Sequence, residues 1–251
     1  MELNLLKTEV FGRNFIYLES VDSTNSYLKR ENDLPDGTVV MTNNQYAGRG
    51  RRGREWIQKD SGSAAISLLI HNADIEDMGT LPLLCGLAAA KAMNGKIKWP
   101  NDVVIDGKKV CGVLCESLIL GDKINAVCGF GVNLTQDKES FIKENLPYAS
   151  SILAQTGKTF TSAEICALIL NELEKLWREY RLNGISDIMK EYSENCVTLN
   201  KTVKVTVDGK ETVCKAIGVN DNGSLNCSDN GKIFSIHSGE ASVRGLYGYV
   251  D

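Results

Sequence analysis

Residues 96–120, KIKWPNDVVIDGKKVCGVLCESLIL, carry the clearest fold signal in this sequence. Asp106-Gly107 separates two runs of apolar and β-branched residues, and Asp-Gly in that setting is a strong signal for a β-hairpin turn. Outward from this turn, further apolar segments bounded by polar residues and glycines predict a sheet. Its expected strands lie at 15–18, 38–42, 63–71, 97–99, 103–105, 109–119 and 124–134.

Helical segments flank these strands. Ser23 can cap a short helix that runs to Arg30, and Thr161 with Glu164 forms a capping box ahead of a long helical periodicity. The expected helices span 24–30, 81–93, 161–183 and 186–194. This order of elements predicts an α+β fold in which helices flank a mixed sheet.

The pattern of apolar and turn-forming residues changes after Asn195. Short alternating segments follow, separated by Asp208-Gly209, Asn222-Gly223 and Asn230-Gly231, which predict tight turns in a small antiparallel barrel or sandwich. We therefore expect two domains, a catalytic domain at 1–196 and a small β-barrel domain at 197–251.

Composition excludes several classes of protein. The chain has 251 residues, 43% hydrophobic and 24% charged, which is typical of a globular protein and not of a disordered one. Its formal charge of −4 argues against bulk attraction to nucleic acid or anionic lipid. The start, MELNLLKTEV, does not resemble a signal peptide, and no apolar run is long enough to cross a bilayer. We expect a soluble, cytoplasmic protein without a membrane partner.

The eight cysteines do not suggest a disulfide framework or a metal site. They are scattered through mostly apolar segments, and only two histidines accompany them. Cys111 and Cys115 have CxxxC spacing, but no second pair follows, as a zinc site would require. We therefore expect reduced, buried cysteines that act as small hydrophobic residues.

Two polar segments could carry chemistry. Residues 48–54, GRGRRGR, could form a solvated basic loop, a nucleic-acid contact or a loop that wraps an anion. The flanking Gln45 and Trp56 favour a loop that folds over a ligand. Residues 98–102, KWPND, could be a plain turn, although the lysine and tryptophan favour a contact with a ligand.

Glycines interrupt two neighbouring strands beside these segments. Gly112 lies within the strand that begins near Lys109, and Gly129 and Gly131 lie within the next strand. Glycine weakens a strand unless something approaches the backbone closely. The pattern therefore predicts a ligand that lies flat against the sheet.

Together and in this order, the segments resemble the biotin–protein ligases. The matching motifs are STN at 23–25, GRGRRGR at 48–54, KWPND at 98–102, KVCGVLCE at 109–116, GFGVN at 129–133 and GEASVR at 239–244. The resemblance covers nearly the whole chain and implies the fold shared by class II synthetases and biotin–lipoate ligases. It also implies a two-step reaction, in which biotin and ATP form biotinyl-AMP and a lysine of a biotin carboxyl carrier protein or domain then receives the biotin.

The resemblance also implies roles for individual residues. Activation brings the biotin carboxylate against the ATP phosphates, so cations are needed where charge develops. The expected catalytic residues are Lys109, Arg51 and Asp102. Biotin is expected to contact Ser23, Thr24, Asn25, Gln45, Gly48, Arg49, Lys109, Gly112, Gly129 and Gly131. ATP is expected to contact Arg51, Arg52, Arg54, Trp56, Lys98, Asn101 and Asn133, together with Mg²⁺, whose protein ligands the sequence does not identify.

Partners follow from the same resemblance. Larger relatives carry an amino-terminal winged-helix domain, whereas only 22 residues precede Ser23, so we expect no DNA binding. A homodimer is compatible with the resemblance, and the role of residues 197–251 stays open, with Arg244 as a candidate ligand contact. A lipoate ligase, which lacks the pairing of GRGR with KWPND, and a non-catalytic sensor, which would not need Lys109, are the alternatives.

Overall fold

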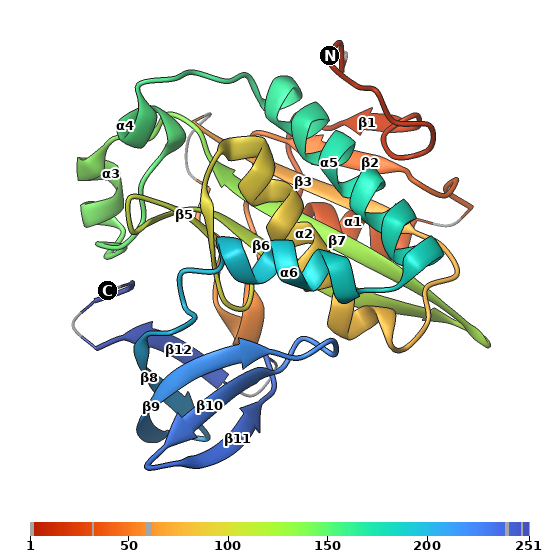
Figure 1. The fold of residues 1–251 in the computed structure, drawn as a ribbon. Helices are drawn as coiled ribbons and strands as arrows, with labels where there is room; N and C mark the ends of the chain where they lie inside the picture. Colours follow the sequence, from red (N-terminus) through yellow and green to blue (C-terminus); the bar gives the residue numbers. More distant parts are fainter. Residues whose placement is uncertain (1–2, 32, 59–61, 239–240, 247, 251) are drawn as a thin grey trace.

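Two sheets organise the computed structural model, which describes residues 3–31, 33–58, 62–238, 241–246 and 248–250 (Figure 1). The larger sheet has seven strands, and β1 pairs with β2 in parallel while its other neighbouring pairs are antiparallel. In ladder order the strands are β1 (Phe15–Tyr17), β2 (Val39–Thr42), β3 (Ser63–Ile70), β7 (Lys123–Asn133), β6 (Lys108–Leu120), β5 (Asp102–Ile105) and β4 (Lys96–Lys98). The predicted mixed sheet is therefore confirmed.

Turn chemistry and register fix the centre of this sheet. Asp106 and Gly107 both have positive φ, 47° and 72°, as a two-residue hairpin turn requires. Strands β6 and β7 pair so that Gly112 lies opposite Gly131. Because side chains alternate along a strand, these glycines share one face of the sheet, while Cys115 and its partner Cys128 lie on the other.

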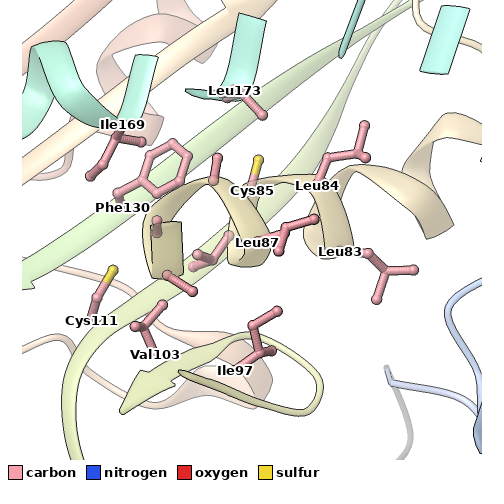
Figure 2. Close-up of a cluster of buried hydrophobic side chains, with 14 of the residues drawn as sticks. Leu83, Leu84, Cys85, Leu87, Ile97, Val103, Cys111, Phe130, Ile169 and Leu173 are labelled. Atoms are coloured by element: carbon pink, nitrogen blue, oxygen red, sulfur yellow. The ribbon is translucent and has the colours of Figure 1, made fainter. Parts of the chain in front are cut away.

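Helices cover the sheet on both faces. They are α1 (Thr24–Arg30), α2 (Asp77–Met93), α3 (Lys138–Lys143), α4 (Ile152–Thr156), α5 (Ser162–Asn183) and α6 (Ser186–Asn195), with a 3₁₀ turn, η1, at Arg51–Gly53. Helices α2, α5 and α6 lie over one face (Figure 1). Figure 2 shows Leu84 and Cys85 of α2 beside Phe130 of β7 and Leu173 of α5, all of them buried. On the opposite face, Leu28 of α1 belongs to a separate buried cluster.

The C-terminal residues form a five-stranded antiparallel sheet. In ladder order its strands are β11 (Lys232–Ile236), β10 (Leu225–Asp229), β9 (Lys210–Val219), β8 (Thr202–Val207) and β12 (Ala241–Gly245). Trp99 joins this sheet to the larger one, because its backbone N–H donates to Thr198 Oγ1 and its indole N–H donates to the Gly223 carbonyl, both at 3.0 Å. The boundary at residue 197 stays a prediction, since residues such as Val203 share one core cluster with α2.

Helix α2 begins one turn earlier than the sequence predicts, and α3 and α4 were not predicted. The first turn of α2 is held by Asp77, whose carboxylate accepts hydrogen bonds from the backbone N–H of Asp74 at 2.7 Å and from the Tyr180 hydroxyl at 2.8 Å. These contacts stabilise the added turn, so the helix begins at Asp77 and Pro82 lies inside it. The Tyr180 contact comes from a distant part of the chain.

Within the described residues, no helix combines the length and apolar character that a membrane span needs.

Candidate active site

A cavity of about 510 Å³ opens on the glycine-bearing face of the large sheet. Elements far apart in the sequence form its wall, from α1 to the end of β12. The predicted site residues that line it are Ser23, Thr24, Asn25, Gln45, Arg49, Arg51, Arg52, Arg54, Trp56, Lys98, Asn101, Asp102, Lys109, Gly112, Gly129, Gly131 and Asn133. Gly48 does not line this cavity; a Cβ there would lie 2.4 Å from Gln45 Nε2, so the absence of a side chain lets the loop pack against Gln45.

The Trp56 ring covers the glycine floor of the cavity. A Cβ on Gly131 would lie 2.3 Å from that ring, and one on Gly112 would lie 3.3 Å from it. Its indole nitrogen is buried without a hydrogen-bond partner among the described residues. A ligand that lies flat on these two glycines therefore requires the ring to move.

Hydroxyl and amide groups gather at the α1 end of the cavity. The Thr24 backbone N–H donates to Gln45 Oε1 at 2.9 Å. Ser67 of β3, which the sequence analysis missed, places its Oγ 2.7 Å from Thr24 Oγ1 and 2.6 Å from Asn25 Oδ1. Ser67 contacts residues more than 40 positions away, so no local pattern identifies it. This end offers hydrogen-bond donors and acceptors to a polar ring.

Glu116 holds this end of the cavity in place. Its carboxylate accepts a hydrogen bond from Asn25 Nδ2 at 2.9 Å and pairs with Lys29 at 3.2 Å and with Arg49. Burial raises the pKa of Glu116, but these hydrogen bonds outweigh burial, so the pKa lies below its ordinary value. Arg49 is thus engaged with a carboxylate, which favours a structural contribution from its side chain.

The other end of the cavity is cationic. Lys109 Nζ lies 2.6 Å from Asp102 Oδ1, and Lys98 Nζ donates to the Val243 carbonyl at 2.8 Å. Burial raises the pKa of Asp102, but the charges of Lys109 and Lys98 outweigh it, so this pKa lies below its ordinary value. Burial lowers the pKa of Lys98 to about 8, although Asp102 opposes that shift. The buried Asp102 carboxylate is therefore paired with Lys109 and also feels the charge of Lys98.

Arg51 joins this cationic end from the arginine loop. Its Nη1 donates to Asn101 Oδ1 at 2.9 Å, and Asn101 in turn donates to the Val113 carbonyl at 2.6 Å. The second terminal nitrogen, Nη2, is buried and has no partner in the part of the chain that the structure describes. Burial lowers the pKa of this guanidinium. An unsatisfied charged donor of this kind suits an anionic ligand, since leaving it unpaired is costly.

The C-terminal part of the chain contributes residues that the sequence analysis did not assign. The Tyr249 hydroxyl donates to Asp102 Oδ2, and its ring stacks on Tyr148 with centroids 5.5 Å apart. Lys98 Nζ lies 4.3 Å from the centroid of the Tyr249 ring, and Arg244 lies over Tyr148. The closing motif predicted Arg244 only as a candidate, and its first two residues, 239–240, lie outside the described residues. No spacing in the sequence links Tyr249 to Asp102.

The described cavity therefore has two chemically distinct ends joined by a flat floor. One end carries hydroxyl and amide groups, with the charge of Arg49 paired to Glu116, and the other end carries two lysines and Arg51. Arg52, Arg54 and Arg244 also line the cavity. Asn133 completes the wall and donates to the Ser150 carbonyl at 3.0 Å. Such a site can bind a polar ring, its acyl chain and a phosphate in line, and stabilise negative charge where the acid meets the phosphate.

Several known proteins are similar to this chain in sequence. The model of the biotin/lipoate A/B protein ligase family matches residues 17–133. The bifunctional ligase/repressor BirA of Bacillus spizizenii is 30% identical over 248 residues, which cover 95% of this chain and 76% of that protein. The biotin–[acetyl-CoA-carboxylase] ligase of Paracoccus denitrificans is 31% identical over 225 residues, which cover 83% of this chain and 91% of that protein.

A solved structure agrees over nearly the whole fold. The biotin protein ligase from Aquifex aeolicus in complex with biotin and ATP aligns with a TM-score of 0.81 and 29% sequence identity. The alignment covers 93% of this chain and 99% of that one, so it includes both sheets.

Proposed function

The chain belongs to the biotin protein ligases of the biotin/lipoate A/B protein ligase family, and from this premise we propose how its cavity residues divide the reaction. The protein is an ATP-dependent biotin–[acetyl-CoA-carboxylase] ligase. It activates biotin as biotinyl-AMP and transfers the biotinyl group to a carrier-protein lysine. The observation that carries the division of roles is the convergence of Lys98, Lys109 and Arg51 on one end of the glycine-floored cavity.

In the first step a biotin carboxylate oxygen attacks the α-phosphorus of ATP, and pyrophosphate leaves. In this proposal Lys109 contacts both reacting anions, and Asp102, whose Oδ1 lies 2.6 Å from Nζ, orients its ammonium group. Arg51, through its unpaired Nη2, holds a phosphate oxygen, and the exposed Arg52 and Arg54 guide the triphosphate. Such preorganised cations stabilise the charge that develops in the transition state.

Biotin and adenine occupy opposite parts of the cavity in this proposal. The ureido ring of biotin bonds Ser23, Thr24 and Gln45, and its acyl chain lies over Gly112 and the Gly129–Gly131 segment. Asn101 and Asn133 contact the nucleotide.

Magnesium enters with ATP in this proposal, because Mg²⁺ is usually held by one or two protein oxygens together with substrate phosphates and water. Both carboxylate oxygens of Asp102 are engaged, by Lys109 and Tyr249. Glu55 also lines the cavity, is exposed, and has no ion-pair partner among the described residues. Glu55 therefore fits as the protein ligand, and the ion supplies charge neutralisation for the pyrophosphate.

In the second step the neutral amine of the carrier lysine attacks the acyl carbon of biotinyl-AMP, the bond from that carbon to the phosphate oxygen breaks, AMP leaves as an anion, and the proton of the amine passes to water. An ordinary lysine has a pKa near 10.4 and is mostly protonated at neutral pH. The lowered pKa of Asp102 makes it a weak base, so its role toward the incoming lysine is to attract the ammonium group rather than to hold its proton. Tyr249 orients Asp102 through the second carboxylate oxygen.

Transfer to a carrier tests this function. Incubation with biotin, ATP and a biotin carboxyl carrier domain should label that domain at one lysine, and a carrier with arginine at that lysine should stay unlabelled. An absence of label on the intact carrier, with active ATP and biotin present, contradicts the transfer step. The cytoplasm as the compartment and a homodimer as the assembly belong to the same proposal through the family resemblance.

The chain is expected not to bind duplex DNA at physiological salt. Non-specific binding depends on neutralising many phosphates, whereas this chain has a formal charge of −4 and two loop arginines are engaged with Glu116 and Asn101. A gel-shift titration should show no retarded band at sub-micromolar protein. A band in that range, insensitive to biotin and ATP, contradicts the expectation.

Catalytic efficiency toward ATP is expected to fall above about pH 8. The pKa of Lys98 is about 8, so its ammonium group is present below that pH and is lost as the pH rises through it. The pH profile of kcat/KM for ATP reports groups of the free enzyme and should show this fall. Lys98→Arg should keep the charge, so the fall should move to higher pH. If the fall stays at the same pH in that variant, another group causes it.

Ligand binding is expected to change the fluorescence of Trp56. Biotin with ATP should displace the Trp56 ring from Gly112 and Gly131, because the bound ligand and the ring would occupy the same floor of the cavity. Emission should therefore shift on addition of the two substrates, and Trp56→Phe should abolish most of the shift. Trp177→Phe is the matched control, because this residue lies on α5 away from the cavity. A shift that survives in Trp56→Phe excludes displacement of this ring as its source.

A further inference from the structure

Three thiols converge on the face of the sheet opposite the cavity. Cys85 comes from α2, Cys115 from β6 and Cys128 from β7, and their sulfur atoms all lie within 4.8 Å of one another. The Cys85 and Cys115 sulfurs are 3.9 Å apart, and Cys115 lies directly opposite Cys128 across the strands. Figure 2 shows Cys85 on α2 within the hydrophobic core. Sequence spacing conceals this cluster, because its members are 30 and 13 positions apart.

The spacing of the sulfurs suits a single bound ion. A thiolate lies about 2.3 Å from a bound metal such as zinc, so three sulfurs around one centre of this size lie at most about 4 Å from one another, and closer when the centre is pyramidal. Cys85 and Cys115 already have this separation, at 3.9 Å, and all three sulfurs lie within 4.8 Å, so binding an ion draws them together. Three cysteine ligands select soft, thiophilic ions rather than hard cations such as Mg²⁺.

The surroundings select the charge of the ion. Cys85 and Cys128 are completely buried, and uncompensated charge in such an interior is costly. Three thiolates leave one net negative charge with a divalent ion and none with a trivalent one. We propose that Cys85, Cys115 and Cys128 form a three-thiol site for a trivalent thiophilic ion, with arsenic(III) as its chemical type.

Binding needs no oxidant or reductant. Arsenous acid, As(OH)₃, exchanges its three hydroxyl groups for three thiolate sulfurs; three As–O bonds break, three As–S bonds form, and the three thiol protons leave in three water molecules. Arsenic stays trivalent, and the product is neutral. The ion enters past Cys115, which is the partly exposed member of the cluster.

Ion binding is expected to weaken biotin binding, and this consequence rests on the proposed biotin site. Leu114 and Glu116, on either side of Cys115, accept hydrogen bonds from the Asn25 amide at 3.2 and 2.9 Å. Gly129, beside Cys128, packs so closely that a Cβ there would lie 2.3 Å from Asn25 Oδ1. Drawing the sulfurs together therefore shifts the backbone that positions Asn25 in the cavity.

Intact-mass spectrometry under native conditions tests the site. The reduced wild-type protein mixed with arsenite should gain one arsenic atom and lose three hydrogens. Cys85→Ala and Cys128→Ala should lose this species, whereas Cys166→Ala, which removes a buried thiol of α5 outside the cluster, should keep it. No adduct in the wild type, or an adduct that persists in both cluster variants, overturns the proposal.

Two further measurements separate binding from folding and from function. Arsenite should raise the melting temperature of the wild type and of Cys166→Ala and leave Cys115→Ser unchanged; an equal rise in Cys115→Ser overturns the site. Arsenite should also raise the KM for biotin several-fold in the wild type but not in Cys85→Ala. If the wild type binds one arsenic atom and the KM for biotin does not change, the coupling between the three-thiol site and the biotin site is refuted. If the protein binds arsenic but has no ligase activity, only the proposed function is refuted.

Discussion

Lys109→Gln is expected to slow biotin-dependent pyrophosphate release by about 10³-fold, the scale seen when a preorganised group for developing charge is removed. Lys109 Nζ lies against Asp102 at the cationic end of the cavity, where the carboxylate and α-phosphate must meet. Glutamine keeps an unbranched stem with a polar end, one atom shorter than lysine, but not the charge. Lys108→Gln is the matched control, because this neighbour is exposed and does not line the cavity.

The Lys109 variant also tests the packing around Asp102. Lys109 pairs with a buried carboxylate, and breaking a fully buried pair costs about 3–5 kcal/mol. The cost should be smaller here, because Lys109 is partly exposed and Lys98 and Tyr249 remain beside Asp102. Lys109→Gln/Asp102→Asn should therefore recover stability without activity. Near-normal pyrophosphate release from folded Lys109→Gln rules out the assigned role.

Arg51→Gly is expected to let biotinyl-AMP escape about 10–100 times faster, which corresponds to the loss of one charge-assisted hydrogen bond of about 1.5–3 kcal/mol. The guanidinium has one nitrogen on Asn101 and one buried without a partner among the described residues, so it is free to hold the phosphate of the intermediate. Escaped anhydride acylates lysines indiscriminately. Biotin incorporation into albumin, with ATP present, should therefore rise in the variant.

Retention and formation can be separated at this residue. Arg51→Lys keeps the charge but loses the fork, so its labelling of albumin should fall between wild type and Arg51→Gly. Adenylate formation should decline less than retention in both variants. If Arg51→Gly makes adenylate and labels albumin no more than the wild type does, Arg51 does not retain the intermediate.

Local signals account for what the sequence predicted well. The Asp106-Gly107 turn and the Thr161–Glu164 capping box depend on neighbouring residues, and the structure has both. Most of the motif residues also line one cavity, although they come from α1, the arginine loop and several strands, and Gly48 lies outside it. The turn and the capping box could be predicted because their signals are short-range.

Long-range contacts explain what the sequence could not predict. Tyr249 reaches Asp102 across 147 positions, and Ser67 reaches Asn25 across 42. The first turn of α2 depends on Tyr180, and the three-thiol cluster depends on the register of β6 against β7. Such contacts arise from packing, and no spacing along the chain encodes them.

Trapping of the acyl-adenylate is the most direct test of the central claim, that the cavity joins biotin to the α-phosphate of ATP. The protein would be mixed with ATP labelled at the α-phosphate and with biotin, lipoate or no acid, and the products resolved before any carrier is added. The expected result is one labelled biotinyl-AMP species, formed only with biotin and nearly absent in Lys109→Gln. An adenylate formed with lipoate but not with biotin, or none from the folded wild type with either acid, contradicts it.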